Sequence, residues 1–295
     1  MTPSPPPSPF RRDCLAGKVA VVTGGGSGIC FEITRQLLLH GCAGAVICGR
    51  REPFLQRACQ SLEQTTGKRA LYRVCDVRNP SQCHQVVEYT LQNLGKIDIV
   101  VNGAAGNFLA EAGALTPKGF RTVMEIDTMG TFNMTHACYE ALKKNGGGVV
   151  INISATLQYG ATWYQIHASA AKSAIDSMTR TWALEWGTDR IRVVGIAPGA
   201  VADTPGTTKL APSMMEDIMN EAIPMGRMAT KAEIGYTAVF LCTEAGSYIT
   251  GDTIVVDGAQ WLYKPPVLPR EMVAEMSRKV EAKSRSQGLA IRSKL

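Results

Sequence analysis

The stretch KVAVVTGGGSGIC, residues 18–30, decides the fold class of this chain. Lys18–Thr23 is a short apolar run that predicts a strand, and a helix is expected from about Gly28. Glycines between a strand and a helix let the backbone approach a pyrophosphate, which the free amides and the positive dipole end of the helix then bind. A plain turn would also fit a glycine cluster, but this position in the first strand–helix unit favours binding. As ligands of the pyrophosphate we predict Gly24, Gly25, Gly26, Ser27, Gly28 and Ile29.

The alternation of strand and helix continues along the chain. Further strands are expected at residues 44–48, 70–74, 97–102, 148–153, 191–197 and 253–256. Helices are expected at residues 28–39, 52–65, 80–94, 120–144, 164–186 and 231–242. Repeated alternation predicts an α/β fold, a doubly wound parallel sheet of Rossmann type with about seven strands in three α/β/α layers. The almost continuously apolar strands agree with burial on both faces.

Length and composition predict one large domain with short additions at both ends. The chain has 295 residues, of which 45% are hydrophobic and 19% charged, enough for a substantial core. Proline-rich residues 1–16 predict a disordered lead, residues 17–262 the Rossmann-type catalytic domain, and residues 263–295 an arm that carries a targeting tripeptide.

Composition also argues against several classes of protein. No apolar run is long enough for a membrane span. The nine cysteines form no C-x-x-C pair and are interpreted as reduced, small hydrophobic residues, and the four histidines lack metal-ligand spacing, so no metal site is expected. Of the net charge of +6, residues 270–295 carry +4, from seven Lys or Arg and three Glu, which argues against a nucleic-acid-binding face on the domain.

The end of the second strand indicates which nicotinamide cofactor binds. An NAD site needs Asp or Glu at this tip to bond the ribose 2′-hydroxyl. Here the strand ends in Cys48-Gly49-Arg50-Arg51, and a guanidinium suits a 2′-phosphate by its charge and its fork of donors. We therefore predict NADPH, with Arg50 and Arg51 at its 2′-phosphate. A solvated Arg51, and Glu52 acting as an NAD-type acid, are the alternatives.

Two later strand ends supply further candidate cofactor contacts. Asp76-Val77 closes the third strand, where a carboxylate can accept a hydrogen bond from the adenine amino group; a helix N-cap near Asn79 is the competing role for Asp76. Asn102 and Ala104 belong to NGAAG at the end of the fourth strand, whose small residues leave room beside the cofactor.

Motifs in a characteristic order give the chain a resemblance to a known family. They are TGGGSGI, DV, NGAAG, AKSAIDSMTR and IAPG, and the match runs from about Gly17 to Trp261. In these motifs the chain resembles the short-chain dehydrogenase/reductase family. Its strings NGAAGNFL, AGAL, IDTMGTFN and HASAAK are most similar to those of the peroxisomal 2,4-dienoyl-CoA reductases, and it ends in Ser293-Lys294-Leu295.

Departures from the family pattern are as informative as the matches. Most members carry Tyr four residues before the active-site Lys and Ser thirteen residues before that Tyr. Counting back from Lys172 gives Ala168 and Ala155, whose methyl groups cannot transfer a proton. Dienoyl-CoA reductases resemble this chain in lacking the Tyr–Lys pair. Cys30 replaces the third Gly of the family's loop, and we expect it to loosen cofactor binding slightly.

The resemblance also implies roles for individual residues. Lys172 would hold the nicotinamide ribose, and Asp127, where many relatives have Asn, would join it in catalysis together with Asn107. A surface Lys172 and an exposed Asp127 are the alternatives. Beside the cofactor we expect Pro198, Gly199, Val201 and Thr204. Substrate-binding residues are expected to be Arg50, Arg78, Asn107, Phe108, Thr116, Lys118 and Lys209, with residues 205–223 as a lid.

The reaction implied by the resemblance is reduction of 2,4-dienoyl-CoA to 3-enoyl-CoA in the β-oxidation of unsaturated fatty acids. Asn107 would donate to the thioester oxygen, and a water ordered by Asp127 and Lys172 would supply the proton. The resemblance further implies a homotetramer packed through residues 120–144 and 164–186, and the terminal Ser-Lys-Leu implies peroxisomal location through an import receptor. Another acyl-thioester reductase, acting on 3-oxoacyl or enoyl substrates, and an inactive NADP-binding scaffold are the alternative functions.

Overall fold

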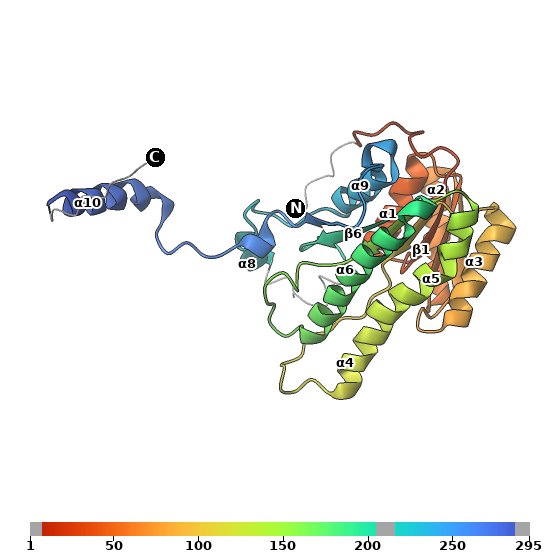
Figure 1. The fold of residues 1–295 in the computed structure, drawn as a ribbon, viewed down its shortest axis with the longest axis horizontal. Helices are drawn as coiled ribbons and strands as arrows, with labels where there is room; N and C mark the ends of the chain where they lie inside the picture. Colours follow the sequence, from red (N-terminus) through yellow and green to blue (C-terminus); the bar gives the residue numbers. More distant parts are fainter. Residues whose placement is uncertain (1–7, 205–215, 287–295) are drawn as a thin grey trace. The chain divides into compact units, whose positions relative to one another are not determined.

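A single parallel sheet of seven strands is the centre of the computed structural model, which describes residues 8–204 and 216–286 (Figure 1). The strands are β1 (Val19–Thr23), β2 (Gly44–Gly49), β3 (Arg69–Val74), β4 (Ile99–Asn102), β5 (Gly148–Ile153), β6 (Ile191–Pro198) and β7 (Thr253–Val256). Their order is β3-β2-β1-β4-β5-β6-β7, so the winding reverses between β1 and β4. Ligands of such sheets bind at the carboxyl ends of the strands beside this reversal. The predicted fold class is confirmed.

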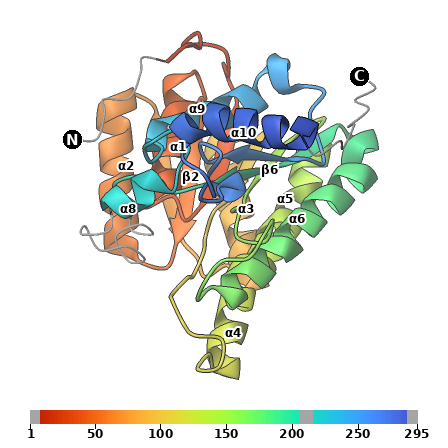
Figure 2. The same cartoon turned by 90° about the vertical axis from the view of Figure 1, so that its left-hand side faces the viewer.

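Helices cover both faces of the sheet and complete the three layers (Figure 2). One face carries α1 (Gly28–Leu39), α2 (Glu52–Thr66) and α9 (Lys231–Cys242), and the other carries α3 (Pro80–Leu94), α5 (Gly130–Lys144) and α6 (Ile166–Trp186). None of the described helices combines the length and apolar content that crossing a bilayer requires.

Alternate residues of each strand feed two separate cores. In β1, Ala20 and Val22 pack with the α1, α2 and α9 layer, whereas Val21 packs with the α3, α5 and α6 layer. Leu15 is fully buried in the first core, and Ser8 Oγ lies 2.6 Å from His40 Nε2. The segment from residue 8 to residue 16 is therefore packed against the domain, which differs from the disordered lead expected there, because Leu15 supplies an apolar anchor that the proline-rich composition conceals.

The long helix expected over residues 120–144 has a different form in the structure. It begins earlier, with α4 (Pro117–Val123), passes through a π-helical segment (Met124–Met129) and continues as α5. The π-helical segment contains Asp127. Such segments inside α-helices are frequent at functional sites.

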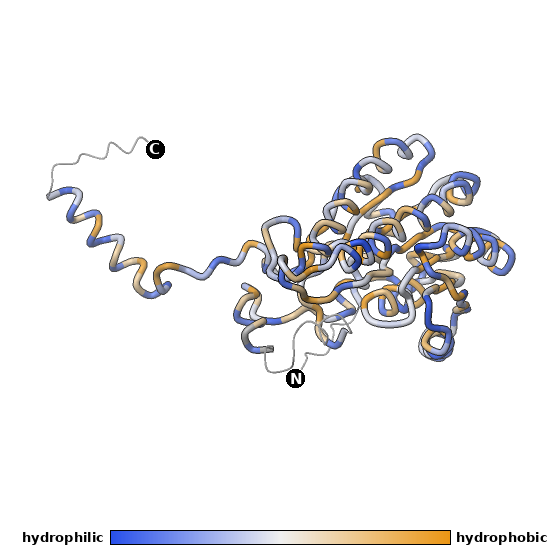
Figure 3. Tube along the Cα trace, turned by 90° about the horizontal axis from the view of Figure 1, so that it is seen from below, coloured by the Kyte–Doolittle hydropathy of each residue, from blue (hydrophilic) through white to orange (hydrophobic). Residues whose placement is uncertain are grey.

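The chain divides into two compact units, residues 1–261 and 262–295. The second unit contains α10 (Val273–Ser286), a helix not anticipated from the sequence. Its apolar residues alternate with charged ones along the tube in Figure 3, and Glu275–Lys279 and Glu281–Arg285 form ion pairs four residues apart, a spacing that supports a helix. The tripeptide Ser293-Lys294-Leu295 lies outside the described residues.

Candidate active site

The glycine-rich loop after β1 lines a cavity of about 460 Å³. A Cβ on Gly24 would lie 2.8 Å from the carbonyl oxygen of Gly103, and one on Gly25 would lie 2.6 Å from Ile47 Cγ2, distances that real Cβ atoms essentially never show. The loop thus requires glycine for its close packing. The Ser27 side chain makes no capping hydrogen bond at the start of α1, so the first helical amides stay available to an anion.

Thr23 fixes the loop after β4 against the end of β1. Its Oγ1 accepts hydrogen bonds from the amides of Gly103 and Ala104, both at 3.0 Å. Cys30 packs behind this junction, because a Cβ on Gly103 would lie only 2.0 Å from Cys30 Sγ. Because Gly103 has no side chain, there is room for the Cys30 side chain at the position where the family has glycine. Burial raises the pKa of the Cys30 thiol to about 12, which keeps it protonated.

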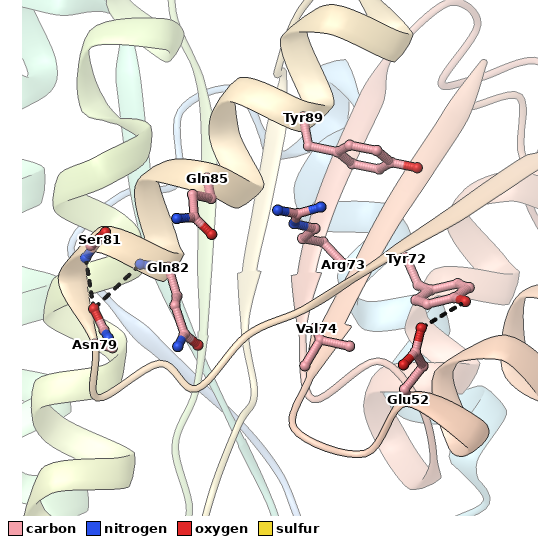
Figure 4. A pocket seen from close by; sticks show the side chains of 9 residues that line it. All are labelled: Glu52, Tyr72, Arg73, Val74, Asn79, Ser81, Gln82, Gln85 and Tyr89. Carbon is pink, nitrogen blue, oxygen red and sulfur yellow. Dashed lines mark hydrogen bonds between the residues drawn. The ribbon is translucent and has the colours of Figure 1, made fainter.

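The two arginines after β2 lie in the cavity lining, as the NADPH prediction requires. The Arg51 guanidinium stacks over the Phe54 ring, 4.1 Å from its centroid. Glu52 is not part of that lining. It lies in a separate groove of about 630 Å³ between β3 and α3, where it accepts a hydrogen bond of 3.3 Å from Tyr72 Oη (Figure 4).

Asp76 lies in the cavity lining at the end of β3. Arg78 donates to both of its carboxylate oxygens, and these hydrogen bonds lower the pKa of Asp76. The helix N-cap proposed as its competing role belongs to Asn79, whose side chain accepts from the amides of Ser81 and Gln82. That alternative for Asp76 is therefore wrong.

A buried ion pair between Asp127 and Lys172 forms the far wall of the cavity. Lys172 Nζ lies 3.2 Å from Asp127 Oδ2 and also donates to the Ile153 carbonyl oxygen at 3.0 Å. The other carboxylate oxygen, Oδ1, accepts from the Gly106 amide at 2.7 Å. Asp127 is 1% exposed and Lys172 8%, so the surface alternatives for both are wrong.

The two alanines that replace the usual Ser and Tyr also line the cavity, beside this ion pair. The hydroxyl groups missing at Ala155 and Ala168 are not supplied by Ser154 or Tyr164. Ser154 is in the lining, but its Oγ donates to Asp176 Oδ1 at 2.6 Å. Tyr164 is half exposed and does not line the cavity.

The loop after β4 is attached to the start of α6. Asn107 Nδ2 donates to Gln165 Oε1 at 2.6 Å, and the Ala110 amide donates to the Tyr164 carbonyl oxygen at 3.0 Å. Asn107 reaches the cavity lining. The next side chain, Phe108, packs its ring against that of His167 with 4.4 Å between centroids.

Residues 24–259, which contain the whole cavity lining, match the family described as Enoyl-(Acyl carrier protein) reductase. The chain belongs to the short-chain dehydrogenase/reductase family. A peroxisomal 2,4-dienoyl-CoA reductase of Arabidopsis thaliana, described as (3E)-enoyl-CoA-producing, is 50% identical over 293 residues, which are 96% of this chain and 98% of that protein.

Solved structures agree with the assignment. A short chain dehydrogenase from Bacillus anthracis has a TM-score of 0.79 and 35% identity, covering 85% of this chain and 100% of its own. A gluconate 5-dehydrogenase from Burkholderia cenocepacia, in complex with NADP and tartrate, has a TM-score of 0.79 and 26% identity, covering 85% of this chain and 99% of its own. The chain is therefore an oxidoreductase of a family that binds nicotinamide cofactors.

Most of the predicted site residues of this reductase meet in the one cavity. Its lining includes Gly24, Gly26, Ser27, Gly28, Ile29, Arg50, Arg51, Asp76, Val77, Ala104, Asn107, Asp127, Lys172 and Thr204. The arrangement combines helix-terminal amides, two arginine guanidiniums and a buried ion pair, which are the parts that a dinucleotide and a reacting carbon chain require.

Several predicted cofactor contacts lie outside that lining. They are Gly25, Asn102, Pro198, Gly199 and Val201. Gly25 packs against Ile47. The Asn102 amide donates to Thr135 Oγ1 at 2.7 Å and to Asn152 Oδ1 at 2.9 Å, and so joins β4 to α5 and β5. The structure thus gives the Asn102 amide nitrogen a part in the core.

Four predicted substrate contacts also lie outside the lining, and a fifth is not described. Arg78 is paired with Asp76, and Thr116 is the N-cap of α4, with its Oγ1 accepting from the Gly119 amide at 3.1 Å. Phe108 and Lys118 are exposed beyond the cavity. Lys209 and most of the expected lid lie outside the described residues; within the rest of that lid, α8 (Glu216–Glu221) is helical.

Sequence reasoning missed the second layer of polar residues around the site. Asp176 on α6 accepts from Ser154 and from Gln158, whose amide reaches its Oδ2 at 2.5 Å. Gln165 holds Asn107, and His167 lies under Phe108. The sequence does show a cluster of polar residues just before and within the AKSAIDSMTR motif. Periodicity alone, however, does not predict which residues these side chains contact.

Proposed function

We propose that this chain uses NADPH to reduce 2,4-dienoyl-CoA thioesters to 3-enoyl-CoA in the peroxisomal oxidation of unsaturated fatty acids. The observation that carries the proposal is the buried Asp127–Lys172 pair beside Ala155 and Ala168. Reduction of a ketone requires an acid in direct contact with the developing alkoxide, and methyl groups supply none. Reduction of a conjugated diene instead moves the negative charge away from the carbon that receives the hydride. The proton can therefore be added at a different carbon, and no acid is needed at the carbon attacked.

The cavity fits a nicotinamide dinucleotide. The glycine loop would hold the pyrophosphate with the first amides of α1, Arg50 and Arg51 would meet the 2′-phosphate, and Asp76 the adenine. Lys172 has three donor hydrogens, of which Asp127 and the Ile153 carbonyl take two, so one is left for the nicotinamide ribose. When bound, the cofactor supplies a hydride to the far end of the diene.

After hydride transfer, residues of the chain stabilise the negative charge and position the proton donor. Negative charge moves through the conjugated system to the thioester oxygen, where a hydrogen-bond donor stabilises it. Asp127, held by the Gly106 amide and by Lys172, accepts a hydrogen bond from a water molecule and directs its other proton to the α-carbon. Protonation at that carbon leaves the remaining double bond between the third and fourth carbons.

A single assay tests this proposal against its competitors. We would follow NADPH oxidation by the purified chain with a 2,4-dienoyl-CoA, a 3-oxoacyl-CoA, a 2-enoyl-CoA and no substrate. The proposal expects turnover with the dienoyl thioester well above the other three. Preference for the oxo or enoyl thioester identifies a different acyl-thioester reductase, and the absence of turnover with all of them indicates a cofactor-binding scaffold.

Arg50→Ala is expected to weaken NADPH binding much more than NADH binding. A charge-assisted hydrogen bond contributes ~1.5–3 kcal/mol, which corresponds to roughly 10- to 100-fold in affinity for the cofactor with the 2′-phosphate. The comparison is made by titrating both cofactors against both proteins. Arg57→Ala is the matched control, since Arg57 lies beside Phe54 but not in the cavity lining. Equal losses for the two cofactors would contradict the assignment of Arg50.

Removal of Leu295 is expected to move the protein from peroxisomes to the cytosol. The import receptor reads Ser-Lys-Leu as a free carboxyl-terminal tripeptide, so loss of the last residue removes the address. The measurement is the distribution of a protein carrying a fluorescent tag at its amino terminus, with and without Leu295. An unchanged distribution would show that another signal directs the protein.

Self-association is part of the proposal. Phe132 on α5 is 40% exposed and Leu184 on α6 is 84% exposed, so both helices present apolar side chains outward within the described chain. Apolar surface of this kind is typical of interfaces between subunits. It agrees with association of copies of the chain through these two helices, and the family resemblance implies a tetramer.

A further inference from the structure

His167 is buried but has no hydrogen-bond partner among the described residues. Its side chain is 0% exposed, and neither Nδ1 nor Nε2 meets a donor or acceptor. A neutral imidazole carries one N–H and one lone pair, and a buried polar group without a partner costs ~1–3 kcal/mol. Because native structures satisfy nearly all such groups, the two nitrogens call for a partner from outside the described residues.

The position of His167 connects it to the substrate side of the cavity. It directly precedes Ala168, a lining residue, in the first turn of α6. Its ring packs against Phe108, at an interplanar angle of 31°, and Phe108 follows the lining residue Asn107. Phe108 is 40% exposed, so an exposed ring lies against the buried one.

The ring of Phe108 is held by packing and is partly exposed. Beyond His167, its ring approaches Gly119, where a Cβ would lie 3.1 Å from Phe108 Cζ. The Phe108 amide is held by the side chain of Asn107, with a hydrogen bond of 2.8 Å to Oδ1, so the backbone is fixed while the ring is anchored by packing alone. Rotation of the Phe108 side chain would therefore uncover one face of the His167 ring, next to the lining residues Asn107 and Ala168.

Most hydrogen-bond donors near His167 are absent or already engaged. The thioester oxygen needs a donor where charge develops. The alanines at the usual Ser and Tyr positions have none, Ser154 donates to Asp176, and Asn107 already gives one N–H to Gln165. Among these residues, His167 is the one with a wholly unengaged donor.

We propose that His167 is a further catalytic residue, whose ring N–H hydrogen-bonds the thioester oxygen of the acyl-CoA after the substrate displaces Phe108. The inference rests on the proposed function. Hydride addition at the fifth carbon breaks the double bond between the fourth and fifth carbons and forms a dienolate. The electron pair reaches the thioester oxygen, where the His167 N–H stabilises it and stays on the ring. The pair then returns to the α-carbon, which takes a proton from the water held by Asp127, and the hydroxide that remains takes a proton from solvent.

His167→Phe and His167→Gln test the proposal together. Phenylalanine keeps a ring against Phe108 and removes both nitrogens, and we expect kcat to fall by ~100-fold or more, the loss typical of one oxyanion donor. NADPH affinity should not change, and the unfolding temperature should stay the same or rise, because two unmet polar atoms disappear. Glutamine restores an N–H and should recover at least a tenth of the wild-type kcat.

Controls separate this inference from a structural role and from the proposed function. Trp163→Phe, at a side chain 82% exposed in the preceding loop, should leave kcat unchanged. An active wild type with an equally active His167→Phe variant contradicts the inference alone. A lower unfolding temperature in His167→Phe, with no recovery of kcat in His167→Gln, would assign His167 a structural part. A wild type that reduces no dienoyl-CoA overturns the proposed function and this inference with it.

Discussion

Asp127→Asn is expected to lower kcat with a dienoyl-CoA by ~10²–10⁴-fold, the range that positioned proton transfer contributes. Asparagine keeps the shape of the side chain and the oxygen that accepts from the Gly106 amide at 2.7 Å. It removes the charge that faces Lys172 and the second carboxylate oxygen that would orient the water. NADPH affinity should change little, because the carboxylate is assigned no contact with the cofactor. Steady-state kinetics and NADPH titration of the same preparation measure both quantities.

Tyr164→Phe is the matched control, because it tests whether Tyr164 acts as the proton donor in place of the Tyr that is absent at position 168. Tyr164 lies eight residues before Lys172, is half exposed, and contributes its carbonyl oxygen to Ala110. Loss of its hydroxyl should leave turnover nearly unchanged. If Tyr164→Phe abolished turnover while Asp127→Asn retained it, Tyr164 would be the acid and the route through Asp127 would be wrong.

The sequence was sufficient for the parts of this molecule that depend on local pattern. Apolar strands of four to eight residues, separated by helical periods, predicted all seven strands, and the bounds of α1, α3 and α9 were predicted as the structure has them. The glycine loop could be placed because its glycines lie between the first strand and the first helix. The structure explains them, since a Cβ on Gly24 or Gly25 would collide with neighbouring atoms. The fold and the glycine loop therefore follow from residue types at fixed spacing.

Features that depend on contacts between distant segments could not be predicted in the same way. Asn102 occupies a position that suggested the cofactor, but its amide joins three elements through Thr135 and Asn152. Similarly, the orphaned nitrogens of His167 become informative only when the burial by Phe108 is known. A single histidine in a sequence is consistent with either a satisfied core residue or a donor kept for a ligand.

The π-helical segment illustrates the same division. Periodicity predicted one helix over residues 120–144, and the apolar run around Asp127 left its exposure open. In the structure the extra residue per turn over Met124–Met129 places Asp127 in the interior, where Gly106 and Lys172 reach it from two other elements. A prediction based on a regular 3.6-residue period does not include this π-helical segment, so it could not decide whether Asp127 is buried or exposed.

Lys172→Met is expected to remove activity and cofactor affinity together. The ammonium both pairs with Asp127 and has a hydrogen left for the nicotinamide ribose, so its loss should weaken NADPH binding by ~10- to 100-fold, the effect of one charged hydrogen bond. The kcat should fall at least as far as in Asp127→Asn. Fluorescence titration and turnover measure the two effects, and Lys172→Arg tests whether charge alone restores them.

The double variant Lys172→Met with Asp127→Asn separates the chemistry from the stability of the pair. Removing one partner leaves the other charge buried and unpaired, which costs ~3–5 kcal/mol, whereas a neutral pair of similar volume often costs nothing. Both single variants should therefore unfold at lower temperature than the wild type, Lys172→Met by more, and the double variant should recover stability but no activity. Recovery of turnover with stability would mean that the pair serves only to hold α6 against the π-helical segment. Persistent inactivity in a stable double variant is what the proposed proton route requires, because neither the carboxylate nor the ammonium assigned to ordering the water is left.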